Sequence, residues 1–144
     1  MPNIEPVNSP CYCISFRRTA GVLSKYYDDA LAPVGLTGNQ FFLLKCVRAL
    51  DECNKTELAR SARLDRTTII RNLETLKKKG LVEEVPGETR RNNIIRLSEA
   101  GYTALTRGGE IWTRLQSDIR KALGEENLSA MWRLFASIET LAKS

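Results

Sequence analysis

The chain contains no histidine, and this absence excludes several kinds of chemistry at once. Serine–histidine and cysteine–histidine nucleophiles both need an imidazole base, and many metal sites need an imidazole ligand. The four cysteines (Cys11, Cys13, Cys46 and Cys53) lack the paired Cys-x-x-Cys spacing of structural zinc sites. The sequence also lacks a glycine-rich phosphate-binding loop between a strand and a helix. We therefore expect that the protein is not an enzyme and that it binds neither a metal ion nor a cofactor.

Long apolar runs are missing as well. No run approaches the roughly 20 residues that span a bilayer. The first ten residues contain three prolines and no apolar centre of the kind that signal peptides have. We expect a cytoplasmic protein without a membrane partner.

What the chain does have is an excess of positive charge. Its 144 residues include 22 Lys and Arg against 17 Asp and Glu, a net charge of +5, and 42% are hydrophobic. This length and composition suit one compact domain with appended helices. The basic balance favours an anionic partner such as nucleic acid.

Helix signals divide the first half of the chain. Ser9 and Pro10 suit the cap and first position of a helix that runs to about Ala32, where Pro33 ends it. Thr37 and Gln40 have capping-box spacing, which predicts a largely buried helix over 41–50. A second cap at Asn54, with Glu57 three residues later, predicts a short helix to about Ala62.

The next helix begins after a cap at Asp65 and has two different faces. At about 100° per residue, Ile69, Leu73 and Leu76 share one face. Thr67, Arg71 and Lys78 project from the opposite face. Gly80 suits a left-handed stop after three lysines. This helix therefore has a core face and a face that is free to read a partner.

A β-hairpin follows, with strands predicted over 81–85 and 93–97 around a Pro-Gly loop that carries Arg90 and Arg91. Helix, turn, helix and hairpin in this order predict a winged helix-turn-helix, mainly α with a small β-hairpin wing (α+β), and thus DNA as the partner. A long helix from Ser98 to about Leu123 and a last helix after Gly124 are strongly apolar. With the first helix, they predict a homodimer interface, and an intramolecular bundle is the alternative.

Taken together, the motifs resemble the MarR family of bacterial transcription regulators. The resemblance runs through Leu36-Thr37-x-x-Gln40, Glu57-Leu58-Ala59, Leu64-Asp65-Arg66-Thr67-Thr68, Leu76-Lys77-Lys78-Lys79-Gly80-Leu81-Val82, and Arg91 followed by Leu97-Ser98-Glu99-Ala100-Gly101. It implies a dimeric repressor on a pseudo-palindromic operator, released by a small molecule or by oxidation. Residues 1–35 would form the arm and first dimerisation helix, 36–98 the DNA-binding lobe, and 99–144 the C-terminal dimerisation helices.

Candidate DNA contacts follow from that arrangement. Arg66 and Arg71 are candidates for guanine edges in the major groove, because a guanidinium donates two parallel bonds there. Thr67 and Thr68 are candidates for phosphate or a thymine methyl. Arg90 and Arg91 suit the minor groove. Further phosphate candidates are Lys55, Lys77 and Lys78.

The wing departs from the family pattern in one place. Thr89 stands where the family commonly has an Asp that pairs with the arginine here numbered Arg91. A hydroxyl cannot form that ion pair. Glu88 substitutes for the missing carboxylate, or the wing reads the minor groove less selectively.

Two kinds of switch are open. The family's effector pocket often accepts aromatic carboxylates, and Arg17, Tyr26 and Tyr27 could supply a cation and aromatic walls. Alternatively, Cys11 and Cys13 fall in the first turn of the first helix, where free N–H groups stabilise a thiolate. Cys13 with Tyr27 is similar to the peroxide-sensing OhrR branch of the family. Cys46 and Cys53 are predicted to be structural.

A different class of function also stays open. The winged helix could serve as a docking module for another protein rather than for DNA. The two classes differ in salt dependence, because neutralising many phosphates makes binding fall steeply with salt.

Overall fold

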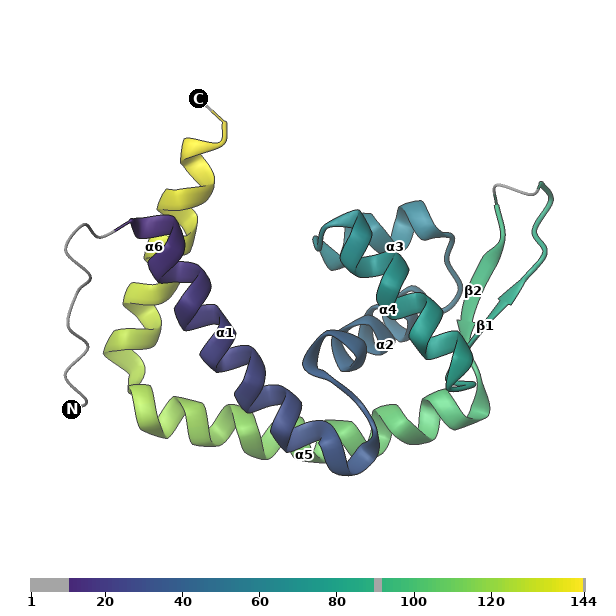
Figure 1. Cartoon of the computed structure of the whole chain (residues 1–144), viewed down its shortest axis with the longest axis horizontal. Helices are drawn as coiled ribbons and strands as arrows, with labels where there is room; N and C mark the ends of the chain where they lie inside the picture. The colour runs from purple at the N-terminus through teal and green to yellow at the C-terminus, as the bar shows by residue number, and fades with distance from the viewer. Residues whose placement is uncertain (1–10, 90–91, 144) are drawn as a thin grey trace. The chain divides into compact units, whose positions relative to one another are not determined.

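A computed structural model of the chain describes residues 11–89 and 92–143 (Figure 1). Within these ranges the fold is mainly helical with one two-stranded hairpin, which confirms the predicted fold class. The chain forms two compact units, Met1–Gly108 and Gly109–Ser144, and the helix α5 (Glu99–Leu123) runs from the first into the second. No helix in the described ranges is long and apolar enough to cross a membrane.

The first helix starts later than the sequence predicts. Helix α1 spans Tyr12–Leu31 and its N-cap residue is Cys11, so the predicted start with Ser9 as cap and Pro10 in the first position is wrong. The backbone of Cys11 is extended, with ψ at 112°, so a continuous helix cannot pass through it to Pro10. A short 3-10 helix η1 (Ala32–Val34) follows α1.

The helix caps in the centre of the chain confirm their predictions. Helix α2 (Gly38–Leu50) begins with the Thr37–Gln40 capping box, and the side chain of Asn54 accepts a hydrogen bond from the amide of Glu57 at the start of α3 (Lys55–Ala62). Helix α4 (Arg66–Lys78) ends near Gly80, whose φ of +72° lies in the left-handed region that glycine adopts without strain.

The hairpin consists of β1 (Val82–Val85) and β2 (Ile94–Leu97), each one residue shorter than predicted. They pair antiparallel, with Val82 opposite Leu97. Cys53 adds a backbone bridge to the base of the hairpin, because it exchanges two hydrogen bonds with Ile95 of 2.7 and 3.1 Å. The hairpin is thereby joined to the chain segment that leads into α3.

The core of the first unit lies where α2 packs against α3, α4 and β2, with β1 against α4 (Figure 1). Burial of these side chains removes apolar surface from water and is the main force that holds the lobe together. The buried set includes Leu31, Leu36, Phe41, Leu43, Leu44, Val47, Leu58, Ile69, Leu73, Leu76, Val82 and Ile95.

The second unit contains the C-terminal part of α5 and α6 (Glu125–Leu141), joined at Gly124. An ion pair of 2.9 Å links Arg120 to Glu125 across this junction, and the rings of Trp132 and Phe135 meet edge to face at 5.7 Å. Helix α6 has no buried residue in this single copy of the chain. Its large exposed apolar side chains are Trp132, Leu134, Phe135, Ile138 and Leu141.

Candidate nucleic-acid interface

Helix α4 has the two faces that the sequence predicts. Ile69, Leu73 and Leu76 are all at most 2% exposed. The opposite side presents exposed side chains, which are those of Arg66, Thr67, Ile70, Arg71 and Lys78. The buried face fixes the helix on the lobe, so that the exposed face offers cations and a hydroxyl on a rigid support.

Asp65 caps this helix through two bonds to one residue. Its carboxylate accepts a hydrogen bond from the amide of Thr68 at 3.0 Å and another from the hydroxyl of Thr68 at 2.5 Å. These bonds, with a smaller contribution from the charge of Arg71, hold the pKa of Asp65 below its ordinary value. The single hydroxyl proton of Thr68 is therefore engaged in the cap, whereas Thr67 is exposed beside it.

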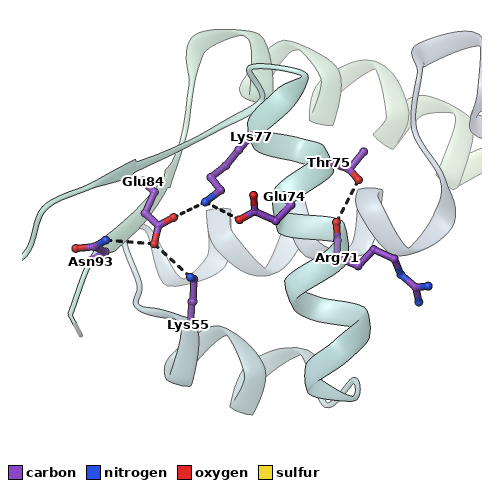
Figure 2. A network of polar contacts seen from close by, with 7 residues as sticks. All are labelled: Lys55, Arg71, Glu74, Thr75, Lys77, Glu84 and Asn93. Atoms are coloured by element: carbon purple, nitrogen blue, oxygen red, sulfur yellow. Dashed lines mark hydrogen bonds and ion pairs between the residues drawn. The ribbon is translucent and has the colours of Figure 1, made fainter. Parts of the chain in front are cut away.

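Glu84 of β1 connects the hairpin to both helices of the helix-turn-helix (Figure 2). Its carboxylate pairs with Lys77 of α4 at 2.5 Å and with Lys55 of α3 at 3.5 Å, and it accepts a hydrogen bond from Asn93 at 3.4 Å. The Lys77 ammonium is the main reason that the pKa of Glu84 lies below its ordinary value. Because the Glu84 side chain is only 14% exposed, water screens this interaction less than a surface pair.

The lysines of this region differ in how free their charges are. Lys77 also pairs with Glu74 at 2.8 Å, so two carboxylates surround its ammonium and raise its pKa. Lys79 donates to the carbonyl of Gly35 at 2.7 Å and to the buried side chain of Gln40 at 3.0 Å. Lys78 is exposed and forms no ion pair within the described part of the chain. Of the predicted phosphate candidates, Lys78 thus has the least engaged charge.

A cavity of about 560 Å³ lies within the first unit, between α1, the start of α2 and α4. Its wall combines apolar, polar and charged side chains. It is lined by Ala20, Leu23, Ser24, Tyr27, Asp28, Thr37, Gly38, Asn39, Arg71 and Asn72. Of the residues predicted for an effector pocket, Tyr27 lines this cavity, whereas Arg17 and Tyr26 are not among its lining residues. Arg71, which the sequence predicts as a DNA contact, also lines the cavity.

Comparison with known proteins shows which family the chain belongs to. The MarR family profile matches residues 36–89. The M. tuberculosis transcriptional regulator MosR, solved in complex with DNA, is 33% identical with a TM-score of 0.79, and the match covers 92% of this chain and 96% of MosR. The chain belongs to the MarR family.

Two further relatives agree with this assignment. The transcriptional repressor CouR, solved with a 23-mer DNA duplex, is 27% identical with a TM-score of 0.74, and the match covers 87% of this chain and 89% of CouR. YwoH of Bacillus subtilis, an uncharacterised HTH-type transcriptional regulator, is 24% identical over 82 residues, which are 57% of this chain. That match spans 60% of the length of YwoH.

Two of the four cysteines of this MarR-family chain are exposed and two are buried. Cys11 and Cys13 are exposed and free, with Cys13 in the first turn of α1. Cys11 is the N-cap residue and not a first-turn residue as predicted, because the helix starts at Tyr12. Cys46 and Cys53 are buried, and burial raises the pKa of Cys53 to about 11, so its thiol stays protonated at neutral pH.

The remaining candidates are distributed as follows. Arg90 and Arg91, predicted at the hairpin tip, lie outside the described residues, whereas Glu88 and Thr89 are exposed on the hairpin loop. Within the described ranges, no group of three or more His, Cys, Asp or Glu side chains could hold a metal ion. The role of Glu84 was not predicted from the sequence. The signal for it is an acidic residue in a predicted strand that follows two predicted helices with lysines, because opposite charges on neighbouring elements can form ion pairs.

Proposed function

We propose that the chain is a sequence-specific, DNA-binding transcription regulator that acts as a homodimeric repressor. The observation that carries this proposal is the exposed face of α4, where Arg66, Thr67 and Arg71 stand on a helix whose other face is buried. The solved complexes of the relatives MosR and CouR with DNA support it.

On DNA, the N-terminal end of α4 enters the major groove. Arg66 and Arg71 reach base edges, and a bidentate contact with guanine is the geometry that suits a guanidinium. Thr67 contacts phosphate or a thymine methyl, and Thr68 offers its methyl while its hydroxyl holds the cap. Arg90 and Arg91 keep the minor-groove role that the sequence assigns to them, and Lys78 contributes to phosphate binding.

Dimerisation is supported by apolar side chains that a single copy leaves exposed. On α1 they include Ile14, Phe16, Val22 and Leu23, and α6 contributes a second set that includes Trp132 and Leu134. Such exposure is rare on a monomer and is typical of a surface that a second copy covers. A two-fold dimer would present two α4 helices to a pseudo-palindromic operator.

An electrophoretic titration of a selected duplex tests the proposal. Arg71→Ala should weaken binding by about 1–3 kcal/mol and relax the preference for the selected sequence. Lys25→Ala is a matched control, because Lys25 is an exposed cation that pairs within α1 to Asp29. Equal affinities of the wild type and Arg71→Ala would remove Arg71 from the interface.

The competing class, a protein-docking module, is separated by a salt titration of the same duplex. The DNA affinity of a dimer that neutralises many phosphates should fall steeply with salt. The slope of log affinity against log salt concentration should be about −0.9 for each phosphate contact. A docking module should show a shallow slope.

For the switch, we propose release by a small aromatic ligand in the cavity beside Tyr27. The cavity volume falls in the range of about 300–1,000 Å³ that small-molecule sites occupy. The relative CouR, 25% identical with a TM-score of 0.75, has been solved with p-coumaroyl-CoA.

A second candidate switch is oxidation at Cys13, which is supported by its exposure and by its place in the first turn of α1. Titrating DNA binding with an organic hydroperoxide, for the wild type and for Cys13→Ser and Cys11→Ser, tests it. Loss of DNA binding in the wild type and not in Cys13→Ser supports the thiol switch. A wild type that keeps its DNA affinity in hydroperoxide excludes oxidation.

A further inference from the structure

Ile70 is an exposed apolar residue on the face of α4 that is proposed to read DNA. Its side chain is 41% exposed, and the other exposed residues of α4 are polar or charged, namely Arg66, Thr67, Arg71, Glu74 and Lys78. We infer that Ile70 is a specificity-determining residue, whose side chain packs against the C5 methyl group of a thymine in each half-site of the operator. This inference rests on the proposed DNA-binding function.

Ile70 lies among the cations of this face and not among the core residues. At about 100° per residue, it lies between Arg66 and Arg71 around the axis of α4. Arg66 and Thr67 are the first two residues of the helix, and Ile70 and Arg71 follow one turn later. If Arg66 and Arg71 contact base edges, Ile70 enters the major groove with them. Single apolar side chains are common on protein surfaces, but this one lies where the proposed partner approaches.

Several polar side chains of α4 already have hydrogen bonds within the lobe. The hydroxyl of Thr68 donates to the carboxylate of Asp65 at 2.5 Å, and the amide nitrogen of Asn72 donates to the carbonyl of Thr68 at 2.8 Å. The hydroxyl of Thr75 donates to the carbonyl of Arg71 at 3.1 Å (Figure 2). Base reading by this helix therefore depends mainly on its exposed residues, of which one is an isoleucine.

The chemistry of an isoleucine side chain selects the group that it contacts. Ile70 has no polar atom, so against a carbonyl or amino group of a base it would displace water without replacing the hydrogen bond. The apolar group that a base pair presents in the major groove is the C5 methyl of thymine. Contact with that methyl removes apolar surface of both groups from water. Because isoleucine is β-branched, its χ1 is largely fixed in a helix, and little side-chain entropy is lost on contact.

The test replaces each thymine of a selected duplex by uracil, one at a time. Uracil lacks the C5 methyl and keeps the hydrogen-bonding groups of thymine. In electrophoretic titrations of the full-length wild type, uracil should weaken binding about fourfold at one thymine of each half-site, which corresponds to the burial of one methyl group. Because the proposed dimer has two-fold symmetry, replacing both symmetry-related thymines should weaken binding about sixteenfold.

Variants of α4 assign this loss to one side chain. Ile70→Ala should bind the thymine and uracil duplexes equally, whereas Ile70→Val, which keeps a branched side chain, should retain part of the difference. Thr67→Ser is the matched control, because it removes a methyl group from the neighbouring exposed residue and keeps the hydroxyl. Thr67→Ser should show the full loss at the same thymine. Each comparison is a ratio of two affinities of one variant, so a change in the folded fraction of that variant cancels.

Three results would overturn the inference and leave the proposed function standing. They are a selected half-site without thymine, a wild type that is indifferent to uracil at every thymine, and a uracil effect that persists in Ile70→Ala. A uracil effect that disappears in Thr67→Ser would assign the methyl contact to Thr67 and would also overturn the inference. A wild type that prefers no DNA sequence would overturn the proposed function and this inference with it.

Discussion

The ammonium of Lys77 lies 2.5 Å from Oε2 of Glu84, so an ion pair joins the last turn of α4 to the first strand of the hairpin (Figure 2). Lys55 of α3 approaches the other oxygen of the same carboxylate at 3.5 Å. One acidic side chain of the wing thus forms ion pairs with both helices.

Replacing Glu84 by Gln should lower the free energy of unfolding by about 1 kcal/mol, measured by urea denaturation. The reason is that two lysines lose the carboxylate that neutralises them in a half-buried place. Glu83→Gln is the matched control, because Glu83 pairs with Arg96 on the exposed side of the same strand, with side chains 51% and 45% exposed. A loss for Glu83→Gln as large as that for Glu84→Gln would contradict the assigned role.

The same carboxylate should make stability depend on pH. The pKa of Glu84 is lowered from its ordinary value of 4.5, mainly by Lys77. The contribution of the Glu84 carboxylate to stability is therefore complete at pH values above the ordinary pKa. It is lost as the pH falls through the lowered pKa. Between about pH 5 and about pH 3 the wild type should lose more stability than Glu84→Gln. Parallel pH profiles of the two proteins would show that Glu84 is not the group responsible.

Gly101 should tolerate no side chain, because a Cβ there would lie 2.0 Å from the carbonyl oxygen of Leu81. Gly101→Ala is expected to lower the free energy of unfolding by about 2–3 kcal/mol, since backbone must move to make room. Gly109, in the same helix, has no atom within 4 Å of its Cβ position. Gly109→Ala should be neutral or stabilising by up to about 1 kcal/mol. Equal melting behaviour of the two variants would refute the close approach.

Local signals in the sequence predicted much of the lobe. The caps at Thr37, Asn54 and Asp65 depend on residues three positions apart, so the sequence alone contains the whole interaction. The core face of α4 follows from helical periodicity in the same way. The prediction that Ser9 caps α1 is wrong, because the extended backbone of Cys11, rather than a side-chain preference, sets where that helix begins.

The parts that sequence reasoning missed depend on residues that are far apart in the chain. Arg71 meets Ala20 and Leu23 in one cavity although about fifty residues separate them, and no periodic pattern relates the two helices. The sequence predicts Lys77 as a phosphate contact but does not reveal that Glu84, seven residues later on another element, pairs with its ammonium. The resemblance to the family suggests Arg17 as the cation of an effector pocket, whereas the cavity is lined by Arg71 and not by Arg17.

Selecting bound sequences from a random pool of duplexes with the full-length protein tests the central claim most directly. The account predicts enrichment of a two-fold symmetric sequence whose half-sites lie about one helical turn apart, since two α4 helices of a dimer must enter successive major grooves. Recovery of a pool with no common sequence, or of a single asymmetric half-site, would contradict it.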